Sequence, residues 1–277
     1  MILNKAVVIS ALLGSFICSP LPLSVAGPVL NDPEKPPETA ASERTPSVRR
    51  LCSAFNELNS LIRDGRISKA AARAKLLEKL AGIRTEYYRG GGSDYRNGQW
   101  VFPLAGYNTG AIDNGKNHGF VPNGYDFFSG NRHGGHPAYD IFIRDRNQDG
   151  LDDRSGKEVG VLSMTGGVVV ALERGWQPGS RLRGGNYIWV FDPANNLLVY
   201  YAHNENIFVE LGTIVKPGDL LATVGRSGLN AAKRRSPTHL HLSVLRLQEG
   251  QPVPVRIYND LQRAGSIPAL DRLNTVK

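Results

Sequence analysis

Histidine is the residue type in this 277-residue chain best suited to chemistry near neutral pH, and two histidines stand two positions apart. They are His239 and His241, which alternate with Leu240 and Leu242. Because side chains along a strand alternate between its faces, both imidazoles would lie on one face and both leucines on the other. Adjacent imidazoles add little to packing, but they suit a site in which one binds a metal and the other moves protons. The segment therefore predicts a metal site on a strand.

An imidazole and a carboxylate four positions apart, His136 and Asp140, offer the second half of such a site. Two imidazoles and one carboxylate leave one position of a tetrahedral zinc ion open, which is the arrangement of catalytic zinc sites. Cys52 lies far away in an expected helix, so metals that prefer thiolate ligands are disfavoured. Either half alone is common in proteins without a metal, and the prediction rests on their joint occurrence.

Residues 136–242 resemble the M23 metallopeptidases of the LytM and lysostaphin type. The first motif of that family is HxGxD, which residues 136–140 match with Ala138 in place of glycine. The last motif is HLHF, which residues 239–242 match with Leu242 in place of the aromatic residue. Between them the family's glycine-containing and Tyr-x-His segments follow in order, at 165–169, 201–203, 212–219 and 225–228.

The resemblance implies a mainly β fold with an antiparallel sheet, and a zinc endopeptidase that cuts peptidoglycan stem or cross-bridge peptides. His239 would be the catalytic imidazole beside one zinc ion, His203 would help it to activate water and stabilise the oxyanion, and Tyr201 would contact the substrate. Such roles are sound chemically, because zinc lowers the pKa of water to about 7 and imidazole exchanges protons at that pH. The implied zinc ligands are His136, Asp140 and His241.

A catalytically silent wall-binding or amidase-activating protein of the same fold is the main alternative. Such members usually lack one or more metal positions, whereas this chain has all of them. A zinc carboxypeptidase of the D-Ala-D-Ala type is a third hypothesis. It is disfavoured, because such enzymes carry E-x-x-H where this chain carries H-x-H. Serine or cysteine hydrolysis is disfavoured, because no G-x-S-x-G elbow occurs and Cys52 has no histidine partner nearby in sequence.

An acidic segment five residues beyond Asp140 suggests a second metal site. It reads D-x-N-x-D-G-x-D-D, with oxygen-bearing side chains at its first, third and fifth positions and a glycine at the sixth, as in a calcium loop. Gly156 stands where such a loop has a bidentate glutamate. An acidic solvated turn explains the segment equally well. The candidate calcium ligands are Asp145, Asn147, Asp149 and Asp153.

The segment 90–133 is rich in glycine and asparagine and contains His118 and His133, which we interpret as loop residues. A second hypothesis is that this segment lines the cleft or covers it in a latent form. In that case Asn114, Asn117 or His118 would approach the zinc ion.

The elements that must position these residues follow from periodicity. Residues 47–89 predict a helical hairpin, with Asp64-Gly65 at the turn and Ser68 as the cap of the second helix. Its packing face would hold Ala71, Ala74, Leu77 (or Leu76) and Ala81. A zinc peptidase domain is expected over 95–260, with its core at 133–248. Its β-branched and aromatic runs predict strands at 139–143, 167–172, 187–191, 197–201, 214–215, 220–224 and 240–245.

The first 46 residues would not belong to the folded domain. Residues 1–26 predict a cleaved secretory signal, since the apolar run 6–18 is too short to span a bilayer, and residues 27–46 predict a proline-rich linker. No later segment is apolar enough to span a membrane. Export implies a periplasmic or extracellular protein, and a net charge of +8 suits an acidic polymer such as the bacterial wall. Nucleic acid is a poor fit, because no known DNA-binding spacing appears.

Overall fold

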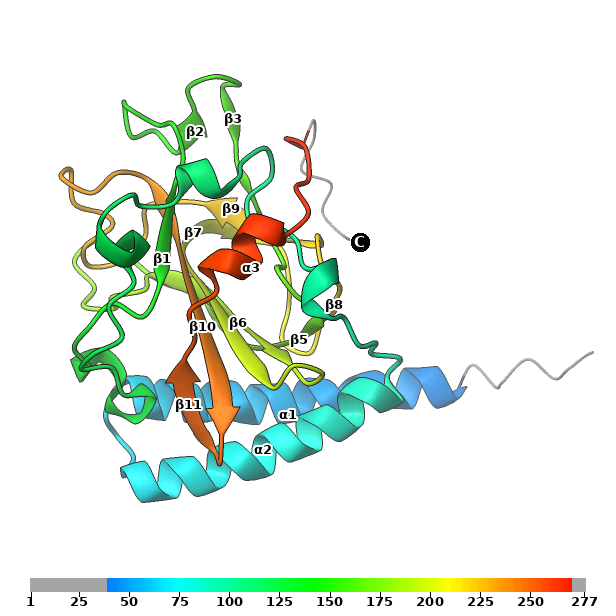
Figure 1. Ribbon diagram of the computed structural model, residues 1–277. Coiled ribbons are helices and arrows are strands. Elements are labelled where there is room, and N and C mark those ends of the chain that lie inside the picture. Colours follow the sequence, from blue (N-terminus) through cyan, green and yellow to red (C-terminus); the bar gives the residue numbers. More distant parts are fainter. Residues whose placement is uncertain (1–38, 271–277) are drawn as a thin grey trace, which may run out of the picture. The chain divides into compact units, whose positions relative to one another are not determined.

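The computed structural model describes residues 39–270 (Figure 1). The expected secretory signal, residues 1–26, and the expected linker up to residue 38 lie outside the described residues. Residues 39–46, expected to be linker, are instead the first part of helix α1, because alanine, glutamate and arginine favour helix there. Within the described residues, no helix combines the length and the apolar character that crossing a membrane requires.

The expected hairpin consists of α1 (Thr39–Arg63) and α2 (Lys69–Arg89). Gly65, in the turn between them, has a φ of 67°, a left-handed conformation that glycine adopts without steric cost. Ser68 caps α2 as predicted, since its side chain accepts a hydrogen bond from the backbone N–H of Ala71. The cap satisfies one of the donors that the first helical turn leaves without a partner.

The packing face of α2 differs from the predicted one. Leu77 is 47% exposed, and the alanines expected beside it are exposed as well. The stripe that packs is made mainly of larger apolar side chains, because these remove more apolar surface from water than alanine does, and it includes Leu76, the predicted alternative to Leu77. Its members are Ala72, Leu76, Leu80, Ile83 and Tyr87.

The domain is built on an antiparallel sheet of nine strands whose main path runs β1-β10-β7-β6-β5-β8. These strands are β1 (Tyr139–Phe142), β10 (His239–Gln248), β7 (Leu197–Ile207), β6 (Asn186–Asp192), β5 (Gly167–Glu173) and β8 (Ile214–Val215). Three strands branch from this path: β11 (Gln251–Pro254) pairs with β10, β9 (Leu220–Val224) pairs with the end of β7, and β4 (Gly160–Leu162) pairs with β9. The predicted fold class, mainly antiparallel β after a helical hairpin, is confirmed.

All seven predicted strand segments correspond to strands of the structure, with only Ile143 falling just beyond β1, while β4 and β11 of this sheet were not predicted. The insertion after β1 forms a separate two-stranded sheet of β2 (Leu151–Asp152) and β3 (Lys157–Glu158). The remaining elements are the short helix α3 (Tyr258–Arg263) and four 3-10 turns, at Asn97–Gln99, Thr109–Ala111, Lys116–Gly119 and Phe127–Arg132.

The two faces of the sheet are covered differently. Leu240 and Leu242 of β10 belong to one apolar cluster, to which α3 contributes Leu261. The opposite face, which carries Trp189 and Leu198, packs against α1 and α2. Figure 1 shows these two helices lying alongside each other next to the sheet and apart from α3. The histidines of β10 alternate with the leucines, so they share the face on which the helical hairpin lies.

Candidate functional site

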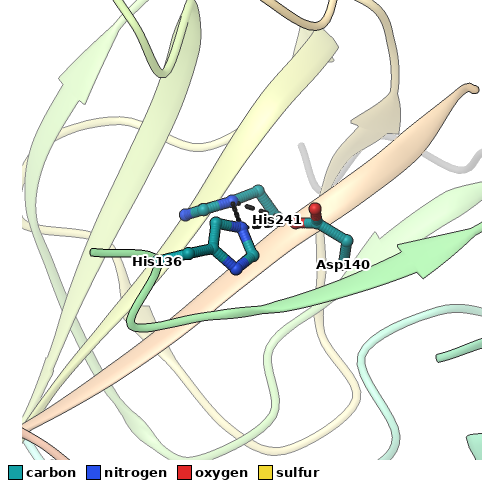
Figure 2. A group of neighbouring side chains, drawn as sticks. All are labelled: His136, Asp140 and His241. Carbon is teal, nitrogen blue, oxygen red and sulfur yellow. Dashed lines mark hydrogen bonds and ion pairs between the residues drawn. The ribbon is translucent and has the colours of Figure 1, made fainter. Parts of the chain in front are cut away.

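Strand pairing brings two of the predicted metal ligands together. Asp140 of β1 lies directly opposite His241 of β10, and both side chains are on the hairpin side of the sheet. The third ligand, His136, comes from the turn before β1. Its backbone N–H donates to the carbonyl of Val121 at 2.6 Å, and its own carbonyl accepts from the Val121 N–H at 2.7 Å. Figure 2 shows the three side chains pointing toward one another.

The spacing of the three ligand atoms fits a single zinc ion. His241 Nδ1 lies 3.0 Å from Asp140 Oδ1, and His136 Nε2 lies 3.2 Å from His241 Nδ1 and 3.3 Å from Asp140 Oδ1. Tetrahedral zinc with bonds of about 2.0–2.2 Å holds its ligand atoms roughly 3.3–3.5 Å apart. Within residues 39–270 this is the only group of three or more His, Cys, Asp or Glu side chains whose ligand atoms converge.

Hydrogen bonding and the charge of Asp140 favour a cation at the point where the three side-chain atoms meet. His136 Nδ1 lies 2.8 Å from the carbonyl oxygen of Gly119, to which it donates, so Nε2 keeps its lone pair for the metal. Burial tends to raise the pKa of Asp140, but its contacts with His136 and His241 outweigh burial and hold that pKa well below its usual range. Burial tends to lower the pKa of His136, yet the nearby carboxylate raises it overall. The carboxylate therefore favours positive charge at the point where the three atoms meet.

Two further imidazoles stand beside the three ligands. His239 Nδ1 lies 2.7 Å from the carbonyl oxygen of Pro237, and His203 Nδ1 lies 2.8 Å from that of Ser227. Each Nδ1–H donates to its carbonyl, which leaves both Nε2 atoms free to accept a proton. The His203 and His239 ring centroids are 4.9 Å apart. Burial, followed by the neighbouring imidazoles, lowers the pKa of His203 well below its usual value, so His203 is neutral at pH 7.

The backbone conformation of His203 explains how its ring reaches this face. His203 has a φ of 68°, a left-handed conformation that is uncommon for residues other than glycine. Ala202, the residue before it, already faces the hairpin, so regular alternation would turn His203 to the other side. The pairing of β7 with its neighbours is irregular next to this point, between Asn204 and Ile207. Such an irregularity re-aims a side chain, and here it brings His203 beside His239.

A cavity of about 350 Å³ is lined by His136, Asp140, His203, His239 and His241. This volume suits a small molecule or part of a peptide. Helix α1 contributes Asn59, Ile62 and Arg63 to its wall, and the loop between β5 and β6 contributes Arg183. Much of the remaining wall is aromatic: Tyr125, Phe127, Tyr187, Trp189 and Tyr200. The contributions of α1 and of both arginines were not predicted from the sequence. No local pattern marks them, because they reach the cavity only through packing of the hairpin on the sheet.

Tyr201 does not occupy the position predicted for it. Its side chain is fully buried in the cluster on the opposite face of the sheet, where its hydroxyl accepts a hydrogen bond from the Met164 N–H at 2.8 Å. The reason is strand alternation, which turns Tyr200 toward the cavity and Tyr201 away from it. Tyr201 is therefore a core residue, and Tyr200 lines the site.

The acidic segment gives the calcium hypothesis no support. Its oxygen atoms are used within the loop: Asp145 accepts from the N–H groups of Asp149 and Gly150 and from the Thr238 hydroxyl. Asn147 donates to Asp149, and Asp153 accepts from the Arg146 N–H. Asp145, Asp149 and Asp153 do not converge on a common point. The segment is a hydrogen-bonded turn that leads into the β2–β3 hairpin.

The segment 90–133 lines the cavity but does not bring Asn114 or Asn117 to the proposed metal ligands. His133 lies in the cavity wall, together with residues of the Phe127–Arg132 turn. His118 instead stacks on Tyr258, with ring centroids 3.6 Å apart, and Asn114 and Asn117 are absent from the cavity wall. The predicted lining role agrees with this geometry, whereas a covering role for Asn114, Asn117 or His118 does not.

The sequence over residues 146–254 matches the sequence model of peptidase family M23. The matched range includes His203, His239 and His241 and begins after His136 and Asp140. It confirms the resemblance that the motifs indicated. Among curated proteins, none matches the chain in sequence.

Solved structures with a similar fold include three bacterial peptidases. A zinc-containing peptidase from Vibrio cholerae is 20% identical, with 61% of this chain and 41% of that chain covered and a TM-score of 0.36. A protein assigned as the glycyl-glycine endopeptidase LytM from Ruminococcus gnavus is 21% identical, with 84% and 90% covered and a TM-score of 0.40. The catalytic domain of lysostaphin from Staphylococcus simulans is 22% identical, with 51% and 87% covered and a TM-score of 0.33.

Proposed function

We propose that this chain, whose residues 146–254 match the sequence model of peptidase family M23, is a zinc-dependent endopeptidase that hydrolyses peptide bonds in peptidoglycan stem or cross-bridge peptides. The observation that supports this most directly is the convergence of His136 Nε2, Asp140 Oδ1 and His241 Nδ1 at distances that suit tetrahedral zinc. Two imidazoles with free Nε2 atoms lie beside them, in the wall of one cavity. Metal-assisted amide hydrolysis combines a Lewis acid with a proton carrier, and this arrangement suits both.

The roles proposed for the chain's own residues follow from their protonation. Zinc, when bound, supplies Lewis acidity that lowers the pKa of water to about 7 and polarises the carbonyl under attack. His239 Nε2 lies 3.7 Å from the Asp140 carboxylate and accepts the proton of the attacking water. The imidazolium that this forms on His239 stabilises the developing oxyanion, and His203, neutral and buried beside it, accepts a hydrogen bond from the attacking water at its free Nε2 and so orients it. The proton returns to the leaving amine, so the pair of imidazoles ends the cycle as it began.

The substrate class is the less direct part of the proposal. It rests on the family, on the expected secretory signal, and on a net charge of +8 that suits an acidic wall polymer. We therefore also propose that the protein acts outside the cytoplasm. The silent alternative is not favoured, because all three ligands and both accessory histidines are present and meet in one place.

The test is to measure bound zinc and the release of peptides from purified peptidoglycan for the parent chain and for two variants. We expect the parent to hold about one zinc ion and to release peptides. His241→Ala should lose the metal and the activity, whereas His239→Ala should keep the metal and lose the activity. A parent that binds no zinc would overturn the proposal, and one that binds zinc without cutting would favour the silent alternative.

A further inference from the structure

Two arginines, Arg63 and Arg183, line the cavity beside the proposed metal ligands, and they differ in whether a carboxylate neutralises their charge. Arg63 is neutralised by carboxylates. Its Nη1 lies 2.9 Å from Glu173 Oε2, and its Nε lies 2.8 Å from Asp64 Oδ1. A further contact runs from Arg63 Nη1 to the Tyr187 hydroxyl at 3.3 Å. Arg63 is thus held in place and neutralised, and it offers a ligand little free charge.

Arg183 has no carboxylate partner among the described residues. Its only hydrogen bonds there run from Nη1 to two backbone carbonyl oxygens, those of His133 at 2.9 Å and Asn131 at 3.4 Å. The guanidinium group has five N–H donors, so Nε and Nη2 remain available for a ligand. The third charged side chain of the cavity, Asp140, is engaged with the metal-binding histidines. Arg183 is therefore the uncompensated charge in the cavity wall.

The backbone around Arg183 is fixed beside the catalytic histidines. The carbonyl of Leu182 accepts a hydrogen bond from the Leu229 N–H at 2.9 Å, and the carbonyl of Gly184 accepts one from the His203 N–H at 3.0 Å. The residue between these two anchors is Arg183, whose side chain is half-buried. The guanidinium group is thus positioned before substrate arrives, which lowers the entropic cost of binding.

A half-buried cation without a counter-charge is costly unless a ligand compensates it. The planar guanidinium fork matches a carboxylate in a bidentate manner, and such charge-assisted bonds are about twice as strong as neutral ones. Peptides offer that group as a C-terminal carboxylate or as a side-chain carboxylate. An exposed arginine on the outer surface would be solvated and would carry no such argument. Arg183 differs because it faces the cavity that holds His203 and His239.

We propose that Arg183 binds a carboxylate of the peptide substrate and so makes the enzyme select carboxylated wall peptides over amidated ones. This inference rests on the proposed function, because it assigns a specificity residue to the same cavity. Arg183 touches the substrate and not the reacting atoms, so it acts mainly on substrate binding. Its loss should raise KM more than it lowers kcat.

The test uses one synthetic wall stem peptide in three forms: with all carboxyl groups free, amidated only at the C-terminus, and amidated only on side chains. We expect the parent to cut the free form about 10–100 times more efficiently than the amidated form that lacks the recognised group. Arg183→Gln should lose this preference through a higher KM for the free form. Arg183→Lys, which keeps the charge, should retain part of it. The two amidated forms identify which carboxylate is bound.

Arg181→Gln is the matched control, because Arg181 lies in the same loop but is exposed and outside the cavity wall. Binding of the same peptides is measured in parallel, by fluorescence anisotropy, with and without Arg183→Gln. A parent that cuts no peptide would contradict the proposed function, while a binding preference for the free form that Arg183→Gln abolishes would still support this inference. Equal treatment of free and amidated peptides by the parent, or a preference that survives in Arg183→Gln, would overturn it.

Discussion

Gly135 controls how His136, the first of the proposed metal ligands, reaches the site. Its φ is 70°, and a Cβ atom there would lie 2.5 Å from the carbonyl oxygen of Asn123 and 2.7 Å from that of Val121. Gly135→Ala must therefore shift the backbone that carries His136, at a cost of about 1–3 kcal/mol. We expect roughly a tenfold or larger loss of zinc affinity, because the ligand atoms no longer meet at the right distances.

Competition with a zinc-binding dye measures this loss. Gly98→Ala is the control, since a Cβ atom at Gly98 meets nothing within 4 Å and its backbone is not left-handed. Zinc affinity should be unchanged there. If Gly135→Ala bound zinc as tightly as Gly98→Ala does, the turn before β1 would not position the ligand.

The buried, neutral His203 makes the stability of the metal-free protein depend on pH. Its folded-state pKa is far below the unfolded value of about 6.5, owing to burial and then to the neighbouring imidazoles. Below that value the unfolded chain binds one more proton than the folded chain at this site. The free energy of unfolding should therefore fall as pH drops below about 6.5, by up to about 1.4 kcal/mol per pH unit.

Urea unfolding of the chelated protein between pH 7.5 and about 5 checks this slope. In His203→Gln the corresponding part of the slope should vanish, because glutamine does not titrate. Identical slopes in the two proteins would mean that His203 does not stay neutral in the folded chain.

How far these residues could be predicted depends on whether the backbone around them is regular. Asp140, His239 and His241 lie in regular strands, so strand alternation predicts that their side chains share one face, as they do in the structure. The same rule, applied to β7, places Tyr201 in the core, which the motif alone did not reveal. His203 reaches the site only through a left-handed residue in β7, and nothing in its neighbouring residues marks that conformation.

At the scale of elements, the buried stripe of α2 determines how the hairpin packs beside the site. Leu80 is 4% exposed, whereas Leu77, three positions earlier, is 47% exposed. Leu80→Ala should lower the free energy of unfolding by about 2–5 kcal/mol, because it leaves a cavity in the packed cluster. Leu77→Ala should lower it by only about 0.5 kcal/mol, as is usual for surface positions.

Urea unfolding of the two variants distinguishes the packing face in the structure from the alanine-rich face that periodicity predicted. Comparable losses from Leu77→Ala and Leu80→Ala would contradict the register described here. The sequence could not settle this point, because the two stripes differ by a small rotation about the helix axis. Only the partner surfaces, α1 and the sheet, select one of them.

At the scale of the whole molecule, the proposed metal centre joins segments that are distant in sequence. His136 precedes β1, Asp140 lies in β1, and His241 lies in β10, about 100 residues farther along the chain. A ligand that binds only the folded chain stabilises it by RT ln(1 + [L]/Kd), which is about 4 kcal/mol at a thousandfold excess over Kd. For a domain of this size that corresponds to a rise in Tm of roughly 10 °C.

Calorimetry with and without a chelator measures that rise. Because zinc would bind through residues 136–140 and β10 at once, the metal-free His241→Ala variant should have a Tm of its own, and added zinc should raise that Tm very little. Leu77→Ala should gain as much as the parent, since Leu77 is exposed and outside the site. If added zinc left the Tm of the parent unchanged, or raised the Tm of His241→Ala by the same amount as that of the parent, metal binding would not couple these segments.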